Sequence, residues 1–271
     1  MITTLAERWN GSTWEIQPTP NPVGSSISLL YGVSCTSSST CIATGEFDSQ
    51  TLAERWDGRT WEILPTPNPS ATFNEFRAVS CTSANACTAV GDYSASTAVQ
   101  TLAERWNGRN WEIQPTPSPA AAGYSTLLGV SCAKRRACTA VGTYFDRTGA
   151  EFMLAEGSHR STWEIQPIAN PADATRSSLS GVSCLTRRAC TAVGSYDTSP
   201  PGTGTAFAGN ATLAERSHGS SWEIQPTPNP ATTTTINLAG VSCATLRTCT
   251  AVGVNGIPSG VTLAEGFSSG T

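Results

Sequence analysis

Ten cysteines are the residues of this 271-residue chain whose type and spacing point most directly to chemistry. They fall into five pairs, and in each pair the second cysteine follows the first by six positions. Two cysteines with five residues between them can face each other across a hairpin, within disulfide distance. The spacing therefore predicts five disulfides, and buried reduced thiols are the alternative interpretation. The pairs are Cys35 and Cys41, Cys81 and Cys87, Cys132 and Cys138, Cys184 and Cys190, and Cys243 and Cys249.

The same cysteines bear on metal binding and on cellular location. A zinc site is not expected, because each repeat supplies two thiols and the chain has only two histidines, His159 and His218. Disulfides persist in oxidising compartments, so the pairing indicates an extracellular or cell-surface protein. The N-terminal segment lacks the basic and apolar regions of a secretory signal, and it begins inside a repeat. We therefore expect the sequence to be a fragment, or to start downstream of the true start site.

A second candidate site combines aromatic and acidic side chains in four loops. Each loop begins Gly-x-aromatic and carries an aspartate beside the ring. An aromatic ring can stack on a sugar, and a carboxylate can accept hydrogen bonds from sugar hydroxyl groups. The pattern is compatible with a glycan or a surface partner as ligand, but it fits packing of the rings at the loop bases better. The candidate ligand-binding residues are Phe47, Asp48, Asp92, Tyr93, Tyr144, Asp146, Tyr196 and Asp197.

Two further groups of charged residues are interpreted as structural. A glutamate follows Leu-Ala in every copy, and a residue present in every copy is not expected to be catalytic, since an active site normally breaks such symmetry. The segments CAKRRAC and CLTRRAC carry Lys134, Arg135, Arg136, Arg187 and Arg188, which would form a basic patch. We interpret these segments as solvated tips rather than as an anion site. The repeated glutamates are Glu7, Glu54, Glu104, Glu156, Glu215 and Glu265.

An internal repeat carries all of these residues. Leu-Ala-Glu occurs six times at intervals of 47 to 59 residues, and Trp-Glu-Ile and Val-Ser-Cys each occur five times. Every unit contains four short segments, LxGVSC, CTAVG, TLAERW and WEIQP, which are rich in β-branched, aromatic or alternating apolar residues. Such segments are typical of strands, and none has a helical apolar period. Four strands in about 50 residues match a β-propeller blade.

The connections indicate the order of the strands within a blade. The connection from WEIQP to GVSC spans 13 or 14 positions in every copy, whereas the one from AVG to LAE spans 7 to 19. A crossover between blades spans a fixed gap, but a hairpin tip in solvent can vary. We therefore place GVSC in strand A (innermost), CTAVG in B, LAERW in C and WEIQP in D (outermost). The B–C loops and D–A crossovers then share one end of each blade, and the A–B and C–D turns share the other.

The number of strands predicts a closed ring. The chain order is C-D, four A-B-C-D sets and A-B-C, or 21 strands where five blades need 20. The N-terminal C–D hairpin would complete the blade begun by Val241–Gly253, and the C-terminal TLAEGF would be spare. A broken six-bladed ring is the alternative. We predict an all-β, five-bladed β-propeller with four antiparallel strands per blade, in one domain over 1–271. The units are 1–22 plus 237–271, 23–69, 70–119, 120–171 and 172–236.

The turn between strands C and D has a distinctive sequence, WDGRTW at Trp56–Trp61, which indicates a tight turn between two packing tryptophans. It resembles the Asp-box turn (Ser-x-Asp-x-Gly-x-Thr-Trp) of sialidase-like propellers, although Asp57 and the following Gly stand one residue closer together. The resemblance implies a structural turn, and a sugar-stacking platform is the alternative. The turn and packing residues are Trp9, Trp14, Trp56, Asp57, Trp61, Trp106, Trp111, Trp163 and Trp222.

The composition narrows the function further. A net charge of −4 without a basic stripe argues against nucleic acid, and no apolar run is long enough to span a membrane. The repeat pattern resembles exported or surface proteins of actinobacteria, which implies a propeller and an extracytoplasmic setting but no activity. The Tyr, Glu and Arg set of sialidase chemistry does not stand out. We predict a non-enzymatic binding module, without cofactor or metal, that uses its B–C loop face. A sialidase-like glycoside hydrolase and a structural or protein-interaction repeat are the alternatives.

Overall fold

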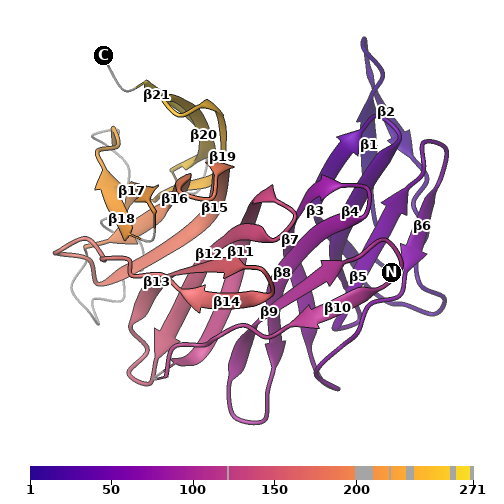
Figure 1. Cartoon of the computed structure of the whole chain (residues 1–271), viewed down its shortest axis with the longest axis horizontal. Helices are drawn as coiled ribbons and strands as arrows, with labels where there is room; N and C mark the ends of the chain where they lie inside the picture. The colour runs from indigo at the N-terminus through magenta and orange to yellow at the C-terminus, as the bar shows by residue number, and fades with distance from the viewer. Residues whose placement is uncertain (121, 199–209, 220, 230–234, 257–260, 269–271) are drawn as a thin grey trace.

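The computed structural model of this chain is built of β-strands and turns, without a helix in the residues it describes (Figure 1). These are residues 1–120, 122–198, 210–219, 221–229, 235–256 and 261–268. The predicted all-β class is confirmed. The predicted B–C loops of the last two repeats extend over 199–209 and 257–260, which lie outside the described residues.

Four blades are complete. Blade 1 contains β3 (Ser28–Ser37), β4 (Thr40–Phe47), β5 (Gln50–Trp56) and β6 (Trp61–Leu64), and blade 2 contains β7 (Asn74–Ser83), β8 (Ala86–Ser94), β9 (Val99–Trp106) and β10 (Trp111–Gln114). Blade 3 contains β11 (Ala122–Lys134), β12 (Ala137–Asp146), β13 (Glu151–His159) and β14 (Thr162–Ile165). Blade 4 contains β15 (Arg176–Thr186), β16 (Ala189–Asp197), β17 (Asn210–His218) and β18 (Ser221–Gln225).

The strands of each complete blade pair in the predicted order A-B-C-D, each antiparallel to the next. In blade 1, Ala43 of strand B lies opposite Val33 of strand A on one side and Glu54 of strand C on the other. Strand A of each complete blade shifts its register by one residue just before the Val-Ser-Cys segment, in the manner of a β-bulge. The order inferred from connection lengths is therefore correct.

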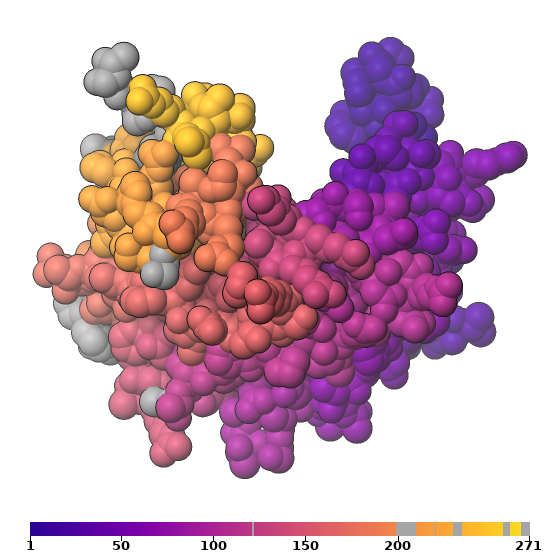
Figure 2. All heavy atoms as spheres, in the orientation of Figure 1, coloured from indigo at the N-terminus to yellow at the C-terminus, as the bar shows by residue number. Residues whose placement is uncertain are grey.

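The hydrophobic core lies between the blades rather than within them. The Leu of Leu-Ala-Glu and the Trp of Trp-Glu-Ile, as in Leu102 and Trp111, pack on the preceding blade. The preceding blade presents the other face of its strands B and C to this interface. At the interface between blades 2 and 3, for example, blade 2 contributes Val90 of strand B and Ala103 of strand C. Side chains on successive strand positions point to opposite faces, so one strand supplies both interfaces. The blades consequently stack side by side, with their A strands in contact along the inside of an arc (Figures 1 and 2).

The predicted closure of the ring is not what the structure shows. β1 (Ala6–Trp9) and β2 (Trp14–Gln17) pair only with each other, and β19 (Ile236–Thr245), β20 (Thr248–Asn255) and β21 (Val261–Ser268) form a separate three-stranded sheet. These two partial blades lie at opposite ends of an open arc in Figure 1. The segment expected to be spare, β21, takes the C position, with Glu265 opposite Ala251. The N-terminal hairpin therefore has no free position there.

The A–B and C–D turns share one end of each blade, as expected. Asp57 Oδ1 accepts hydrogen bonds from the backbone N–H groups of Arg59 (2.7 Å) and Thr60 (2.8 Å), which closes the C–D turn. Gly58 has a φ of +100° and lies against Ser39 of the neighbouring A–B turn. The rings of Trp56 and Trp61 are 5.6 Å apart across the hairpin. These contacts give the repeated turn a structural role.

All ten cysteines are joined in the five pairs that the spacing predicts. In each pair the two cysteines are direct register partners on strands A and B, with Cα atoms 3.9 to 4.0 Å apart. Each disulfide therefore fixes the base of one A–B tip. The tips of blades 3 and 4 are those that carry the adjacent arginines.

Candidate functional site

The aromatic residues of the B–C loops lie at the loop bases, against the core. Tyr93, Tyr144 and Tyr196 are partly buried and pack on the clusters between blades. The hydroxyl of Tyr93 donates to Gln100 Oε1 at 2.8 Å, and the ring of Tyr144 stacks on Phe152 at 5.3 Å. Their faces are thereby engaged by protein, which favours packing over sugar stacking.

The aspartates beside these rings are engaged as well. Asp48 accepts hydrogen bonds from the backbone of Ser26 and Ile27, and Asp146 accepts them from Thr148 and Ala150. These donors lower the pKa of Asp146, because they stabilise its charged form. Asp197 is buried at the end of β16, and Thr175 donates to its backbone carbonyl. Their hydrogen bonds support the loops themselves.

A polar cluster on β3 and β4 of blade 1 and β7 of blade 2 was not anticipated. The hydroxyl of Tyr31 donates to Glu46 at 3.0 Å, the guanidinium of Arg77 lies 5.4 Å from the Tyr31 ring, and Arg77 pairs with Glu75. Burial and the neighbouring carboxylates raise the pKa of Tyr31 to about 12 and that of Glu75 to about 7. These positions differ from blade to blade, which is the signal that sequence reasoning overlooked.

This cluster contains residue types that hydrolytic sites use, since an adjacent carboxylate such as Glu46 can act as the base for a tyrosine hydroxyl. Burial and the hydrogen bond to Glu46 raise the pKa of Tyr31, which favours its protonated form. Buried Asp92 accepts a hydrogen bond from Thr126 at 2.6 Å and is adjacent to Glu75, so the two acids share one electrostatic environment. The arrangement is a polar network that joins blades 1, 2 and 3, exposed at Tyr31 and buried at Glu75 and Asp92.

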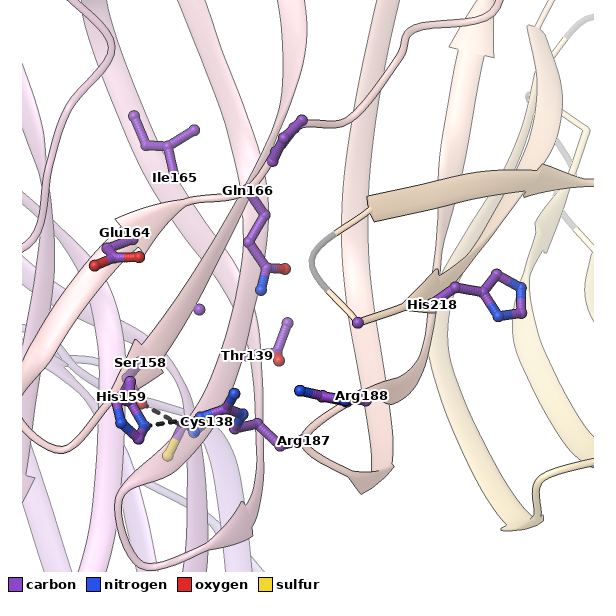
Figure 3. Close-up of a pocket in the computed structure, with 13 residues that line it drawn as sticks. Cys138, Thr139, Ser158, His159, Glu164, Ile165, Gln166, Arg187, Arg188 and His218 are labelled. Carbon is purple, nitrogen blue, oxygen red and sulfur yellow. Dashed lines mark hydrogen bonds between the residues drawn. The ribbon is translucent and has the colours of Figure 1, made fainter.

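A cleft of about 630 Å³ lies between blades 3 and 4, at the end that carries the A–B and C–D turns (Figure 3). We call it the basic cleft. One wall consists of Gly157, His159 and Gln166 from blade 3, and the other consists of Arg187, Arg188 and His218 from blade 4. Its volume lies in the range of about 300–1,000 Å³ that small-molecule sites occupy. The predicted solvated tips therefore line a concave surface.

A departure from the repeat opens this cleft. Between the N-terminal hairpin and blade 1, the guanidinium of Arg8 lies over the ring of Trp56 at 5.8 Å and fills the corresponding space. Alignment of the repeats places Gly157 at the position of Arg8, and Ser217 at the position of Trp56. The Trp is also replaced at the preceding interface, by Ser158, so the glycine at the arginine position is what distinguishes this interface. The neighbouring interfaces keep Arg105 and Arg216, and the cavities there have volumes of about 10 Å³.

Hydrogen bonds hold the side chains of the basic cleft in place. The indole Nε1 of Trp222 donates to Gln166 Oε1 at 2.8 Å, which leaves the amide NH₂ group of Gln166 over Gly157. Arg187 Nη1 lies 2.8 Å from His159 Nδ1. Because a guanidinium can only donate, Nδ1 accepts and the ring proton sits on Nε2. The cleft thus presents guanidinium, amide and imidazole donors.

The repeated glutamates lie elsewhere, inside the interfaces. Glu54, Glu104, Glu156 and Glu215 are fully buried. Burial raises the pKa of Glu54 to about 7, that of Glu104 to about 9 and that of Glu156 to about 8. Each lies in its own blade rather than facing a second acid in a cleft, so the structural interpretation stands. The described residues contain no group of three potential metal ligands and no helix suited to crossing a membrane.

Comparison with known proteins identifies the class of fold. A six-bladed propeller lectin of Aleuria aurantia with a fucose recognition mode aligns at a TM-score of 0.55, with 13% identity over 97% of this chain and 85% of that chain. A candidate glycoside hydrolase of Parabacteroides distasonis has a TM-score of 0.46 and 11% identity, over 91% and 88% of the two chains. YCF48 bound to a D1 peptide has a TM-score of 0.40 and 14% identity, over 99% and 87%. The chain therefore has a β-propeller type of fold.

No protein-family model and no curated protein match the sequence. The relationship is accordingly one of fold, since the identities are below the level at which function is shared. The function rests on the chain's own surfaces.

Proposed function

We propose that this chain is a non-enzymatic binding module for a glycan on a partner or surface, and that the ligand occupies the basic cleft. The observation that carries the proposal is the glycine at the arginine position of blade 3, where Gly157 lines a cleft of about 630 Å³. Among the complete blades, only blade 3 lacks the arginine, and a concave polar surface forms there. The fucose-binding lectin shows that a propeller of similar fold can serve this purpose.

The B–C loop face is the second location for the same function. It is the face on which the repeats vary most, but the rings of Tyr93, Tyr144 and Tyr196 are engaged in packing. The five disulfides support an oxidising, extracytoplasmic location for either site.

Glycoside hydrolysis is the alternative, and the cluster of Tyr31, Glu46, Glu75 and Arg77 is the observation in its favour. A purely structural role is the other alternative, and it predicts no saccharide binding at all.

A glycan array probed with wild type, Gly157→Arg and Asp146→Asn separates these possibilities. Gly157→Arg restores the side chain that other repeats carry and fills the cleft. Asp146→Asn keeps the turn acceptor but removes the charge from the B–C face. We expect Gly157→Arg to lose glycan signals that Asp146→Asn retains. The reverse pattern would move the site to the B–C face, and turnover of chromogenic glycosides that disappears in Glu75→Gln would replace the binding module with a hydrolase.

A further inference from the structure

The basic cleft is surrounded by positive charges that have no acidic partner. Among the described residues, the only salt bridges are Arg77 with Glu75, Arg105 with Glu112 and His218 with Glu223. Arg187 and Arg188, which line the cleft, belong to none of them. The chain has a net charge of −4, so acidic residues outnumber the basic ones, yet none of them pairs with these two arginines among the described residues.

The positive charge extends beyond the cleft onto an adjoining groove. A second hollow of about 590 Å³ shares His159, Arg187 and Arg188 with the cleft, and it is also lined by Lys134, Arg136 and Arg160. Five cationic side chains therefore surround two connected hollows. Like charges at this density repel one another, and an anion between them removes that cost.

Acidic groups near the cleft do not neutralise it. Glu164 lines the outer wall on β14, and Figure 3 shows its carboxylate on the opposite side from Arg187 and Arg188. Glu223 lies 3.5 Å from the His218 imidazole, whose ring points away from the centre in the same view. The inner part of the cleft is consequently faced by donors from both walls.

We propose that the basic cleft selects a saccharide that carries an oxyanion, such as a uronic acid carboxylate or a sugar sulfate. This inference rests on the proposed function and names its ligand class. Arg187 and Arg188 bind the oxyanion, because guanidinium groups match carboxylate and sulfate oxygens with paired donors. The amide NH₂ of Gln166, fixed by Trp222, donates to a ring or hydroxyl oxygen.

The cleft favours a saccharide over an acidic peptide because its blade 3 wall carries no arginine or lysine, and its one acidic residue, Glu164, lies away from the two arginines. Gly157, Gln166 and the imidazole of His159 suit hydroxyl groups. A peptide of several acids would be matched instead by cations on both walls. The groove beyond has such cations, so an acidic peptide is an outcome that the test must resolve.

The test is isothermal titration of the wild-type chain with methyl β-D-glucuronide, methyl β-D-glucoside and glucose 6-sulfate. The first two differ only by a carboxylate in place of a hydroxymethyl group. We expect the glucuronide or the sulfate to bind at least tenfold more tightly than the glucoside, since a hydrogen bond to a charged group contributes about 1.5–3 kcal/mol. Whichever anion binds more tightly identifies the source of the oxyanion.

Three variants make the result specific to the cleft. Arg187→Ala with Arg188→Ala should reduce the anion's affinity at least tenfold, whereas Arg109→Ala, in the exposed turn of blade 2, should leave it unchanged. Gly157→Arg adds a positive charge but fills the space, so it should also abolish binding. Stronger binding in Gly157→Arg would show unspecific attraction to a basic surface and overturn the proposal.

The remaining outcomes separate failure of this inference from failure of the proposed function. Equal affinity for glucuronide and glucoside, lost in Gly157→Arg, would overturn the oxyanion preference and leave a neutral glycan site. A hexaglutamate peptide that binds more tightly than every saccharide would replace the ligand class. No saccharide binding in any arm would overturn both.

Discussion

At the scale of single residues, burial of the repeated glutamate costs free energy of folding. Both carboxylate oxygens of Glu54, Glu104 and Glu215 are buried and have no hydrogen-bond partner in the described part of the chain. A buried carboxyl group without a partner favours its neutral form. Since this is true in several blades at once, the stability of the whole array should depend on pH.

The sign of that dependence follows from the direction of the pKa shifts. The pKa of Glu104 is raised to about 9 in the folded chain and is near its ordinary value when unfolded, so the folded chain holds the proton over the range between. The contribution of this group to the free energy of unfolding is therefore fully present at acidic pH, and it is lost as the pH rises from about 5 to about 9. Glu104→Gln should flatten the slope of unfolding free energy against pH and stabilise the chain by roughly 1–3 kcal/mol at pH 8.

Urea denaturation at pH 5, 7 and 9 measures this prediction. The matched control is Glu112→Gln on the same hairpin, because Glu112 is exposed and pairs with Arg105. Its slope should equal that of wild type. Identical slopes for wild type and Glu104→Gln would mean that Glu104 is ionised in the folded chain.

The site also shows how far single residues can be interpreted from sequence. Gly157 and Ser217 are visible as departures from the repeat, but their proximity is not. Recognising it requires knowing that the arginine position of one blade faces the tryptophan position of the next, as Arg8 faces Trp56. Sequence alone therefore predicts the arginine tips but not the space between them.

At the scale of elements, the A–B tips link the disulfides to the site. Cys184 and Cys190 bracket the tip that bears Arg187 and Arg188, and they join directly opposite strand positions. A tip closed by a covalent bond has few conformations, so its arginines are preorganised for a ligand. The disulfides thus serve the binding surface as well as the stability of the blade.

Replacing Cys184 and Cys190 by serine should therefore affect binding and stability together. Losing the cross-link that closes a loop of about seven residues lowers the free energy of unfolding by about 2 kcal/mol in the chain-entropy estimate. The control is the equivalent double replacement at Cys35 and Cys41, in blade 1 and away from the cleft. Both should lower the urea midpoint, but only the first should weaken binding of the glucuronide or sulfate. Equal binding in the two variants would show that the tip is ordered without its disulfide.

The elements were the part of the fold most open to prediction. Strand order followed from connection lengths, since the crossover spans a fixed gap between blades, and the disulfides followed from the hairpin geometry. The packing role of Tyr93 and Tyr144 was left open, because an aromatic residue at a loop base has the same sequence signature whether it packs or binds. Only their contacts with the core decide between the two.

At the scale of the whole molecule, counting strands predicted a closed ring. The count did not consider that two copies of strand C compete for the same position in the last blade. Two copies of strand C were available for one position beside β20, and β21 is the nearer along the chain. A hairpin partner pays a small loop-closure cost, whereas the N-terminal hairpin must be brought from the far end of the chain. The position was therefore filled locally, and the arc stayed open.

The open arc leaves the N-terminal hairpin uncovered, and this can be measured. Trp9 and Trp14 are 50% and 65% exposed, while their counterparts Trp106 and Trp111 are 4% and 5% exposed. The latter two are covered because a preceding blade packs on them, and the N-terminal hairpin has no such neighbour in the described chain. Acrylamide should therefore quench a fast fraction of the tryptophan fluorescence that disappears in Trp9→Phe with Trp14→Phe.

The control for this measurement is Trp106→Phe, which should leave the fast fraction intact because that ring is buried. A closed ring would bury the first pair as well, since the front of the hairpin would then pack on a neighbouring blade. If the double variant retained the fast fraction, the two tryptophans would be covered in solution. The arc would then close, and β1 would have displaced β21 from its position beside β20.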